Sequence, residues 1–161
     1  MLAFYYLVQQ AHWVKDVKGS IECMYNNLRT NGKVVLEFGG KGNVQTLITE
    51  LRNSLKIRGY NNQANLDLWY FPSIGEYATA LESGGFKVLS AEHYDRPTEL
   101  ADEKSGIKDW LSMFAESFFI GVLENHQEEI KNEVQEKIKD KCLINSKWFA
   151  DYKRIRIVAV K

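Results

Sequence analysis

The sequence predicts an α/β fold in which helices cover both faces of a sheet. Continuous apolar runs, such as "LAFYYLV" (2–8), are typical of strands that are buried on both faces. The segments between these runs carry apolar residues at helical spacing. The resulting order is strand–helix–strand–helix–helix–strand–helices–strand, which is the order of an α/β layer.

Each element follows from its local pattern. In chain order we predict a strand at 2–8, a helix at 14–29, a strand at 33–38, a helix at 43–59, a helix from Ser73 to Gly84-Gly85, a strand at 87–93, a helical region at 106–143 and a strand at about 152–160. Ser73 and Glu76 have the spacing of a capping box at the start of the third helix. Asn43 is a suitable N-cap for the second helix. An aromatic-rich apolar stripe runs through 107–122.

Composition sets limits on the class of protein. The 161 residues are expected to form one domain, 1–161, because that length supports a sizeable core. Lys+Arg and Asp+Glu are both 21, and this zero net charge gives no support for nucleic-acid binding. The two cysteines, Cys23 and Cys142, lack metal-ligand spacing and suggest a reducing compartment. The apolar start is too short to span a bilayer, so we expect a cytoplasmic protein without a membrane partner.

The loop in "EFGGKGNV" (37–44) joins a strand to a helix and contains three glycines and Lys41. Its spacing matches neither a P-loop nor a dinucleotide fingerprint. Two interpretations stay open, a structural turn and a generic anion site at a helix N-terminus. In either case, ligands of such folds bind beyond the carboxyl ends of the strands, which places this loop close to a candidate site.

Several stretches together resemble one known family. They are "AHWVKD" (11–16), "GKVVLEFGGKGNV" (32–44), "WYFPSIGEYATALESGGFKV" (69–88), "DRPTEL" (95–100), "GIKDWLSMF" (106–114) and "WFADYKRIRIVAVK" (148–161). In this order they resemble the C-terminal part of class I S-adenosylmethionine-dependent methyltransferases, most closely the trans-aconitate methyltransferase-like group. The family's glycine-rich cofactor loop and its ribose-binding acidic residue would then lie upstream of Met1.

The resemblance implies a more specific fold. It predicts a partial Rossmann-like methyltransferase sheet, with three parallel strands and an antiparallel C-terminal strand between the second and the third. A helical cover at about 105–143 would close over the substrate. The first strand departs from the family pattern, because Ala3, Leu7 and Val8 stand where an acidic residue and a small polar pair are usual.

The resemblance also implies two sets of site residues, with no catalytic residue and no metal ligand. The cofactor-binding positions for S-adenosylmethionine are Gln10, Ala11 and His12. The substrate-binding positions are Trp13, Glu37, Gly39, Gly40, Lys41, Tyr70 and Arg96. The residues themselves also favour Glu37, because a charge within a buried strand is costly unless it is paired. Several of these keep a structural alternative. His12 and Trp13 could simply close the strand, and Tyr70 could fill the core.

Methyl transfer to a carboxylate needs few catalytic side chains. A carboxylate that accepts a methyl group needs no general base, so catalysis can rest on positioning and electrostatics. An arginine is the natural clamp for such a substrate, and Arg96 is the first candidate, with Arg154 and Arg156 as alternatives. Arg96 could instead pair only with Asp95 or Glu99 at the surface.

Three hypotheses of function follow. The first is a methyltransferase acting on a small-molecule carboxylic acid, of which this chain is the C-terminal portion and which is inactive as an isolated chain. The second is a non-catalytic binding or self-association module derived from the same fold. The third, a nucleotide-binding protein, rests on the glycine loop alone. In both of the first two cases the apolar strand 2–8 would lack a neighbour, and we expect a homodimer through it, with the helix 14–29 in or near the interface.

Overall fold

The computed structural model describes residues 2–8, as backbone, and residues 15–161. The chain divides into two compact units, which are described separately. Unit 1 contains Met1–Asn43, Leu68–Arg96 and Lys153–Lys161, and unit 2 contains Val44–Asp67 and Pro97–Tyr152. Because the two units alternate along the chain, the expectation of one domain over 1–161 stays a prediction.

Unit 1 is built on a four-stranded sheet in the order β1-β2-β7-β3. Its elements are β1 (Leu2–Val8), α1 (Val17–Asn27), β2 (Leu28–Gly39), α4 (Ile74–Ser83), β3 (Lys87–Asp95) and β7 (Lys153–Val160). β1 and β2 pair in parallel, with Leu7 opposite Leu36. β7 pairs antiparallel with both β2 and β3, so that Ile157 lies between Leu36 and Ala91. The final strand therefore has the place and direction that the sequence predicted.

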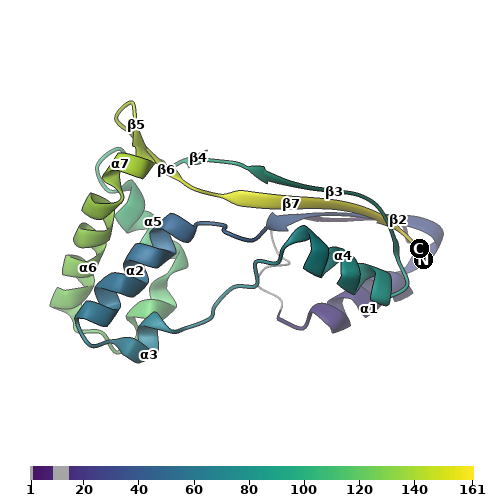
Figure 1. The fold of residues 1–161 in the computed structure, drawn as a ribbon, viewed down its shortest axis with the longest axis horizontal. Helices are drawn as coiled ribbons and strands as arrows, with labels where there is room; N and C mark the ends of the chain where they lie inside the picture. The colour runs from purple at the N-terminus through teal and green to yellow at the C-terminus, as the bar shows by residue number, and fades with distance from the viewer. Residues whose placement is uncertain (1, 9–14) are drawn as a thin grey trace. The chain divides into compact units, whose positions relative to one another are not determined.

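The core of unit 1 lies on one face of this sheet. Alternate residues of β2 and β7 point to that face and are buried, and helices α1 and α4 supply the opposing apolar residues. Figure 1 shows α1 and α4 on the same side of the sheet. The buried set comprises Ile21, Met24, Leu28, Val34, Leu36, Phe38, Tyr77, Leu81, Phe86, Ile155, Ile157 and Ala159. Residues of the opposite face, such as Val35 and Val158, are only half-buried.

The predicted fold class is wrong in two respects. Among the described strands, β1–β2 is the one parallel ladder, and all other ladders are antiparallel, so the expected Rossmann-like sheet of parallel strands is not formed. The described helices of unit 1 cover one face of its sheet and not both. A continuous apolar run predicts a buried strand, but it does not identify which neighbour the strand pairs with or what covers each face.

Unit 2 is mainly helical and contains a second, antiparallel sheet in the order β4-β6-β5. Its elements are α2 (Gln45–Ile57), α3 (Asn61–Ala64), β4 (Thr98–Glu99), α5 (Gly106–Phe114), the 3₁₀ helix η2 (Glu116–Phe119), α6 (Glu124–Lys137), α7 (Lys139–Cys142), β5 (Leu143–Ile144) and β6 (Lys147–Ala150). The sequence did not predict this sheet, because strands of two to four residues are too short to show a period of two.

Local signals fixed several helix ends. The capping box is confirmed, since Ser73 Oγ accepts a hydrogen bond from the Glu76 N–H and the Glu76 carboxylate accepts one from the Ser73 N–H. α1 begins later than predicted, at Val17, because the Asp16 side chain caps it by accepting from the Gly19 N–H at 2.9 Å.

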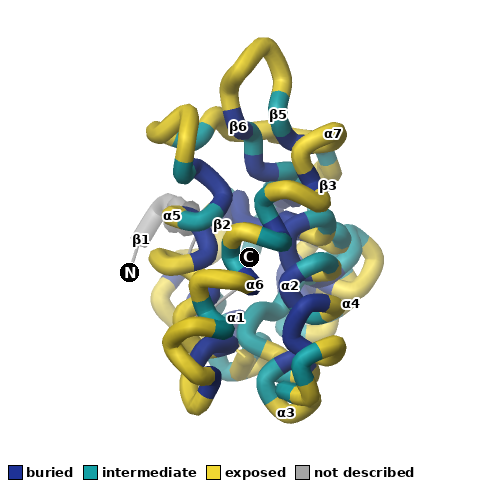
Figure 2. Tube along the Cα trace, turned by 90° about the vertical axis from the view of Figure 1, so that its left-hand side faces the viewer, coloured by how far each residue is buried: buried dark blue, intermediate teal, exposed yellow. Residues whose placement is uncertain are grey.

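The buried stretches of α2 are dark blue in Figure 2. Among the described helices, none combines the length and apolar character that a membrane crossing requires.

Candidate functional site

Three strands of unit 1 end at the same end of its sheet. β1 and β2 are parallel, and β7 is antiparallel to both β2 and β3, so β1, β2 and β3 point in the same direction. Their carboxyl ends are Val8, Gly39 and Asp95. Ligands of open α/β sheets bind beyond such ends. The charged residues around Gly39 and Asp95 are therefore the candidate site.

A single buried carboxylate, Glu37, organises this end of the sheet. Arg156 lies directly across from it on β7 and donates from Nε and Nη2 to Glu37 Oε2, at 2.9 and 2.7 Å. Arg96, just after β3, places Nη1 3.3 Å from Glu37 Oε1. Both carboxylate oxygens thus have a guanidinium partner. The Glu37 side chain is buried, whereas those of Arg96 and Arg156 are 50% and 49% exposed.

This arrangement keeps Glu37 ionised. Burial alone raises the pKa of the Glu37 carboxyl. Hydrogen bonds from Arg156 and Tyr94, together with the charges of Arg156 and Arg96, outweigh burial and hold the pKa below its ordinary value. The same bond to Glu37 raises the pKa of Arg156. The three charges sum to +1, because one carboxylate faces two guanidinium groups.

Tyr94 completes the cluster. Its hydroxyl accepts a hydrogen bond from Arg156 Nη2 at 3.3 Å, and the Arg156 guanidinium carbon lies 5.5 Å from the centre of its ring. Burial raises the pKa of the Tyr94 phenol, and the interaction of Tyr94 with Glu37 raises it further. Tyr94 therefore stays neutral and helps to fix the direction of the Arg156 side chain.

The glycine loop is a structural turn, which was one of the two interpretations left open. The Gly40 N–H donates to Lys153 O at 3.0 Å, the Lys41 N–H to Pro72 O at 2.9 Å and the Asn43 N–H to Gly40 O at 2.9 Å. A phosphate would need these same N–H groups. Close packing explains the glycine at position 40, because a Cβ there would lie 2.6 Å from Ile155 Cγ2.

The sequence predicted Asn43 as the N-cap of the second helix, and this prediction is wrong. Val44 occupies the N-cap position and makes no side-chain cap hydrogen bond. The buried Asn43 side chain instead accepts, through Oδ1, the Lys153 N–H at 2.8 Å. Asn43 thereby ties the glycine loop to the start of β7, a partner that is remote in sequence and so could not be predicted.

The structure brings some of the predicted site residues together and separates others. Glu37 and Arg96 meet, and Arg96 pairs with neither Asp95 nor Glu99, whose cation partners are Lys153 and Lys147. Gly39, Gly40 and Lys41 form the adjoining turn. Tyr70 packs against the core of unit 1 with its ring 6.5 Å from that of Tyr77, in agreement with the structural alternative. Gln10, Ala11, His12 and Trp13 lie outside the described residues.

Two members of the site were not foreseen. Tyr94 and Asn43 were missed as site residues, whereas Arg156 had been named as an alternative clamp. For Arg156, the sequence signal was the alternation of "KRIRIV" (153–158), because it places residues 154 and 156 on one face of the strand. Within the part of the chain that the structure describes, no three His, Cys, Asp or Glu side chains are grouped so as to hold a metal ion.

Comparison with known proteins shows a similarity in sequence to a methyltransferase. No family model matches the chain. A methyltransferase of Schizosaccharomyces pombe, described as uncharacterized, is 33% identical over 143 residues, which make up 83% of this chain and 51% of that protein. The chain thus spans about half the length of this relative.

Solved structures show the same fold. A loganic acid methyltransferase, solved with S-adenosylhomocysteine, aligns with 99% of this chain and 61% of its own, at a TM-score of 0.58 and 12% identity. The YcgJ protein of Bacillus subtilis aligns with 99% of this chain and 64% of its own, at a TM-score of 0.54 and 12% identity. The likeness in sequence to the S. pombe relative and the likeness in fold to these structures together make the chain a methyltransferase-like protein.

Proposed function

We propose that this chain forms the acceptor-binding portion of a methyltransferase that acts on a small-molecule carboxylic acid. The observation that supports it is the pair of half-exposed guanidinium groups, Arg96 and Arg156, held by one buried carboxylate at the carboxyl ends of the strands. A planar guanidinium is the side chain best suited to bind both oxygens of a carboxylate.

Glu37 would act as a positioning residue in this proposal. Without a fixed partner, two arginine side chains would lose conformational entropy when they close on a ligand. By binding both in advance, Glu37 lowers that cost. The chain's contribution to methyl transfer would then be to hold and orient the acceptor, because a carboxylate is already nucleophilic and needs no base.

Tricarballylate, a saturated tricarboxylic acid, is a suitable probe for this site. Its affinity for the full chain would be measured by calorimetry. Arg96→Lys keeps the charge but loses the planar fork and should weaken binding several-fold, whereas Arg96→Ala should weaken it by roughly tenfold or more. Arg29→Ala is the matched control, because Arg29 is an exposed arginine near the opposite end of β2. Equal affinity in the wild type and both Arg96 variants would exclude the role of Arg96.

The cofactor requires a separate proposal. The N–H groups of Gly40, Lys41 and Asn43 bond within the chain, so these three groups are not available to the cofactor's carboxylate or ribose. We keep Gln10, Ala11 and His12 as the proposed cofactor contacts and expect this chain alone to bind S-adenosylmethionine only weakly and to show no turnover. Micromolar affinity in calorimetry, or methyl transfer to an acid by the isolated chain, would contradict this expectation.

The alternative, a self-association module, is favoured by one difference between the two edges of the sheet. The edge strand β3 contains Lys87, Glu92, His93 and Asp95, and such charges discourage pairing with another chain. The opposite edge strand, β1, has no charged residue in Leu2–Val8. We propose that two copies of the chain associate through β1, with the segment 14–29 in or near the interface.

Sedimentation tests this association. Replacing both Tyr5 and Leu7 by lysine should give a monomer or insoluble protein, because lysine on an edge strand opposes pairing. Leu89→Lys, on the β3 edge, is the control and should leave the association unchanged. A wild-type chain that sediments as a folded monomer at high concentration would refute the proposed dimer.

A further inference from the structure

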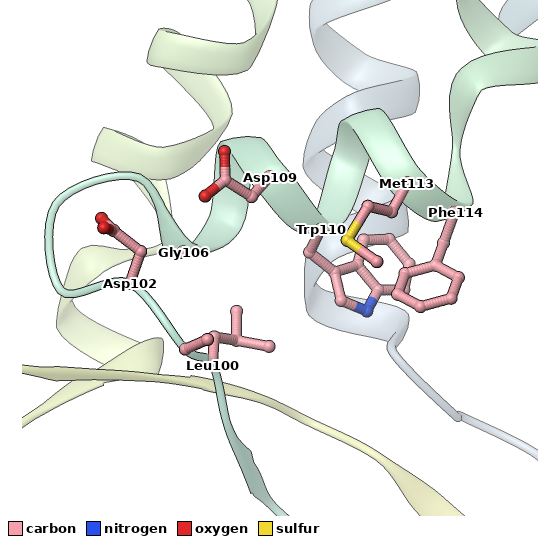
Figure 3. Close-up of a pocket in the computed structure, with 8 residues that line it drawn as sticks. Leu100, Asp102, Gly106, Asp109, Trp110, Met113 and Phe114 are labelled. Carbon is pink, nitrogen blue, oxygen red and sulfur yellow. The ribbon is translucent and has the colours of Figure 1, made fainter.

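A pocket in unit 2 lies outside the site described above. It opens between the segment that follows β4 and the helix α5, and its volume is about 170 Å³. Figure 3 shows the side chains around it. The residues that line it come from the segment 100–102 and from α5.

The apolar residues of α5 exceed what packing needs. Ile107, Trp110 and Leu111 are buried and pack this helix into unit 2. Met113 and Phe114, in the last turn, are 72% and 41% exposed. Two large apolar side chains exposed beside a pocket are typical of a ligand-binding surface.

The walls of the pocket are held in place before any ligand arrives. Trp110 Nε1 donates a hydrogen bond to the Tyr152 hydroxyl at 2.8 Å, which fixes the indole ring. The Leu100 N–H donates to Trp148 O at 2.8 Å. At Gly106 the backbone packs so closely that an added Cβ would lie 3.0 Å from Trp148 Cβ. A preformed wall reduces the entropy that binding would cost.

The two carboxylates at the rim are bound to their own loop. Asp102 Oδ1 accepts hydrogen bonds from the N–H groups of Lys104 and Ser105, at 2.8 and 2.6 Å. These hydrogen bonds lower the pKa of Asp102 and keep it charged, and the bond from Ser105 has the largest effect. Ser105 Oγ lies 2.6 Å from Asp109 Oδ2. The rim therefore carries negative charge next to an apolar interior, which disfavours an anionic ligand.

We propose that this pocket binds an uncharged, apolar group about the size of a benzene ring. An apolar protein cavity of about 150 Å³ is known to accept benzene, so the volume is adequate. The apolar wall formed by Leu100, Trp110, Met113 and Phe114 supplies the favourable contacts. This inference does not depend on the arginine site and is independent of the proposed function.

Methionine methyl groups provide a direct readout. The chain has three methionines, of which Met113 lines the pocket and Met24 is buried in the core of unit 1. In protein labelled with ¹³C at the methionine methyls, phenol should shift the Met113 signal saturably, with a Kd on the order of 1 mM, and leave Met24 unchanged. Benzoate has the same ring with a negative charge and should bind at least about fivefold more weakly.

A pair of variants tests the location. Ala101→Trp adds a large ring at a residue that lines the pocket and should abolish the phenol-dependent shift of Met113. Ile57→Trp adds the same ring at another exposed site of unit 2, since Ile57 is 72% exposed on α2, and should bind phenol as the wild type does. Wild-type-like circular dichroism and a cooperative thermal transition show that the variants are folded. The proposal is overturned if phenol leaves Met113 unshifted, if benzoate binds as tightly as phenol, or if the two variants behave alike.

Discussion

Replacing Glu37 by glutamine tests how strongly the buried carboxylate stabilises unit 1. The substitution keeps the shape and one acceptor oxygen but removes the charge that faces Arg96 and Arg156. Hydrogen bonds to a charged group contribute ~1.5–3 kcal/mol when buried, whereas exposed ion pairs contribute ~0–1 kcal/mol. Because both arginines are half exposed and can be hydrated, we expect Glu37→Gln to lower the free energy of unfolding by ~1–2 kcal/mol.

Urea unfolding measures this difference. With an m-value of about 2 kcal/mol/M, the midpoint should fall by roughly 0.5–1 M. The effect should also depend on pH in a definite direction. The pKa of Glu37 is lowered from its ordinary value of 4.5, so its charge stabilises the folded chain above that pH, and the contribution is lost as the pH falls through the folded-state pKa.

The difference between wild type and Glu37→Gln should therefore be full at about pH 7 and clearly smaller at about pH 4. Glu82→Gln, at an exposed carboxylate of α4, is the control and should change the midpoint little. Equal effects of the two substitutions, or an effect of Glu37→Gln that is the same at both pH values, would refute the assigned role of the carboxylate.

Three further predictions concern stability and reactivity. Leu36→Ala, at a fully buried position of β2, should lower the free energy of unfolding by ~2–5 kcal/mol in urea titrations, and a loss below ~1 kcal/mol would contradict the assigned core. Ser73→Ala removes one half of the capping box and should cost ~1 kcal/mol, whereas Ser73→Asp should retain most of the stability. A thiol reagent at neutral pH should label the exposed Cys23 quickly and Cys142 slowly, because burial raises the pKa of Cys142 to about 11. Two equally fast thiols would show that the surroundings of Cys142 open readily.

The sequence predicted well those features that depend on local pattern. The strands of unit 1 and the capping box at Ser73 are present, although β2 begins at Leu28 and not at residue 33. The antiparallel direction of the final strand was implied by the family resemblance and not by local pattern. Glu37 was recognised as a site candidate because a charge within an apolar strand is costly unless it is paired. Its main partner could not be identified, since which residue of β7 lies opposite Glu37 depends on strand register.

The errors share a physical cause, which is that periodicity indicates burial but not backbone hydrogen bonding. The aromatic stripe over 107–122 was expected to be continuous helix, yet α5 ends at Phe114 and a 3₁₀ turn follows. Phe118 and Phe119 are buried nonetheless, so the stripe identified core residues correctly. The hairpin of β5 and β6 was not predicted, and only its first residue, Leu143, fell in the predicted helical region, because its strands are too short to establish an alternating pattern.

The interleaving of the two units constrains how the chain can fold while it is being synthesised. All segments of unit 2, 44–67 and 97–152, leave the ribosome before β7 does. Unit 2 can therefore complete its structure early, whereas β2 and β3 must wait for the strand that lies between them. During this interval the apolar residues of β2 and their unpaired backbone groups are open to chaperones and to aggregation. The last strand thus acts as the closing step of unit 1, and loss of β7 alone should leave a chain with a folded unit 2 and an unfolded unit 1.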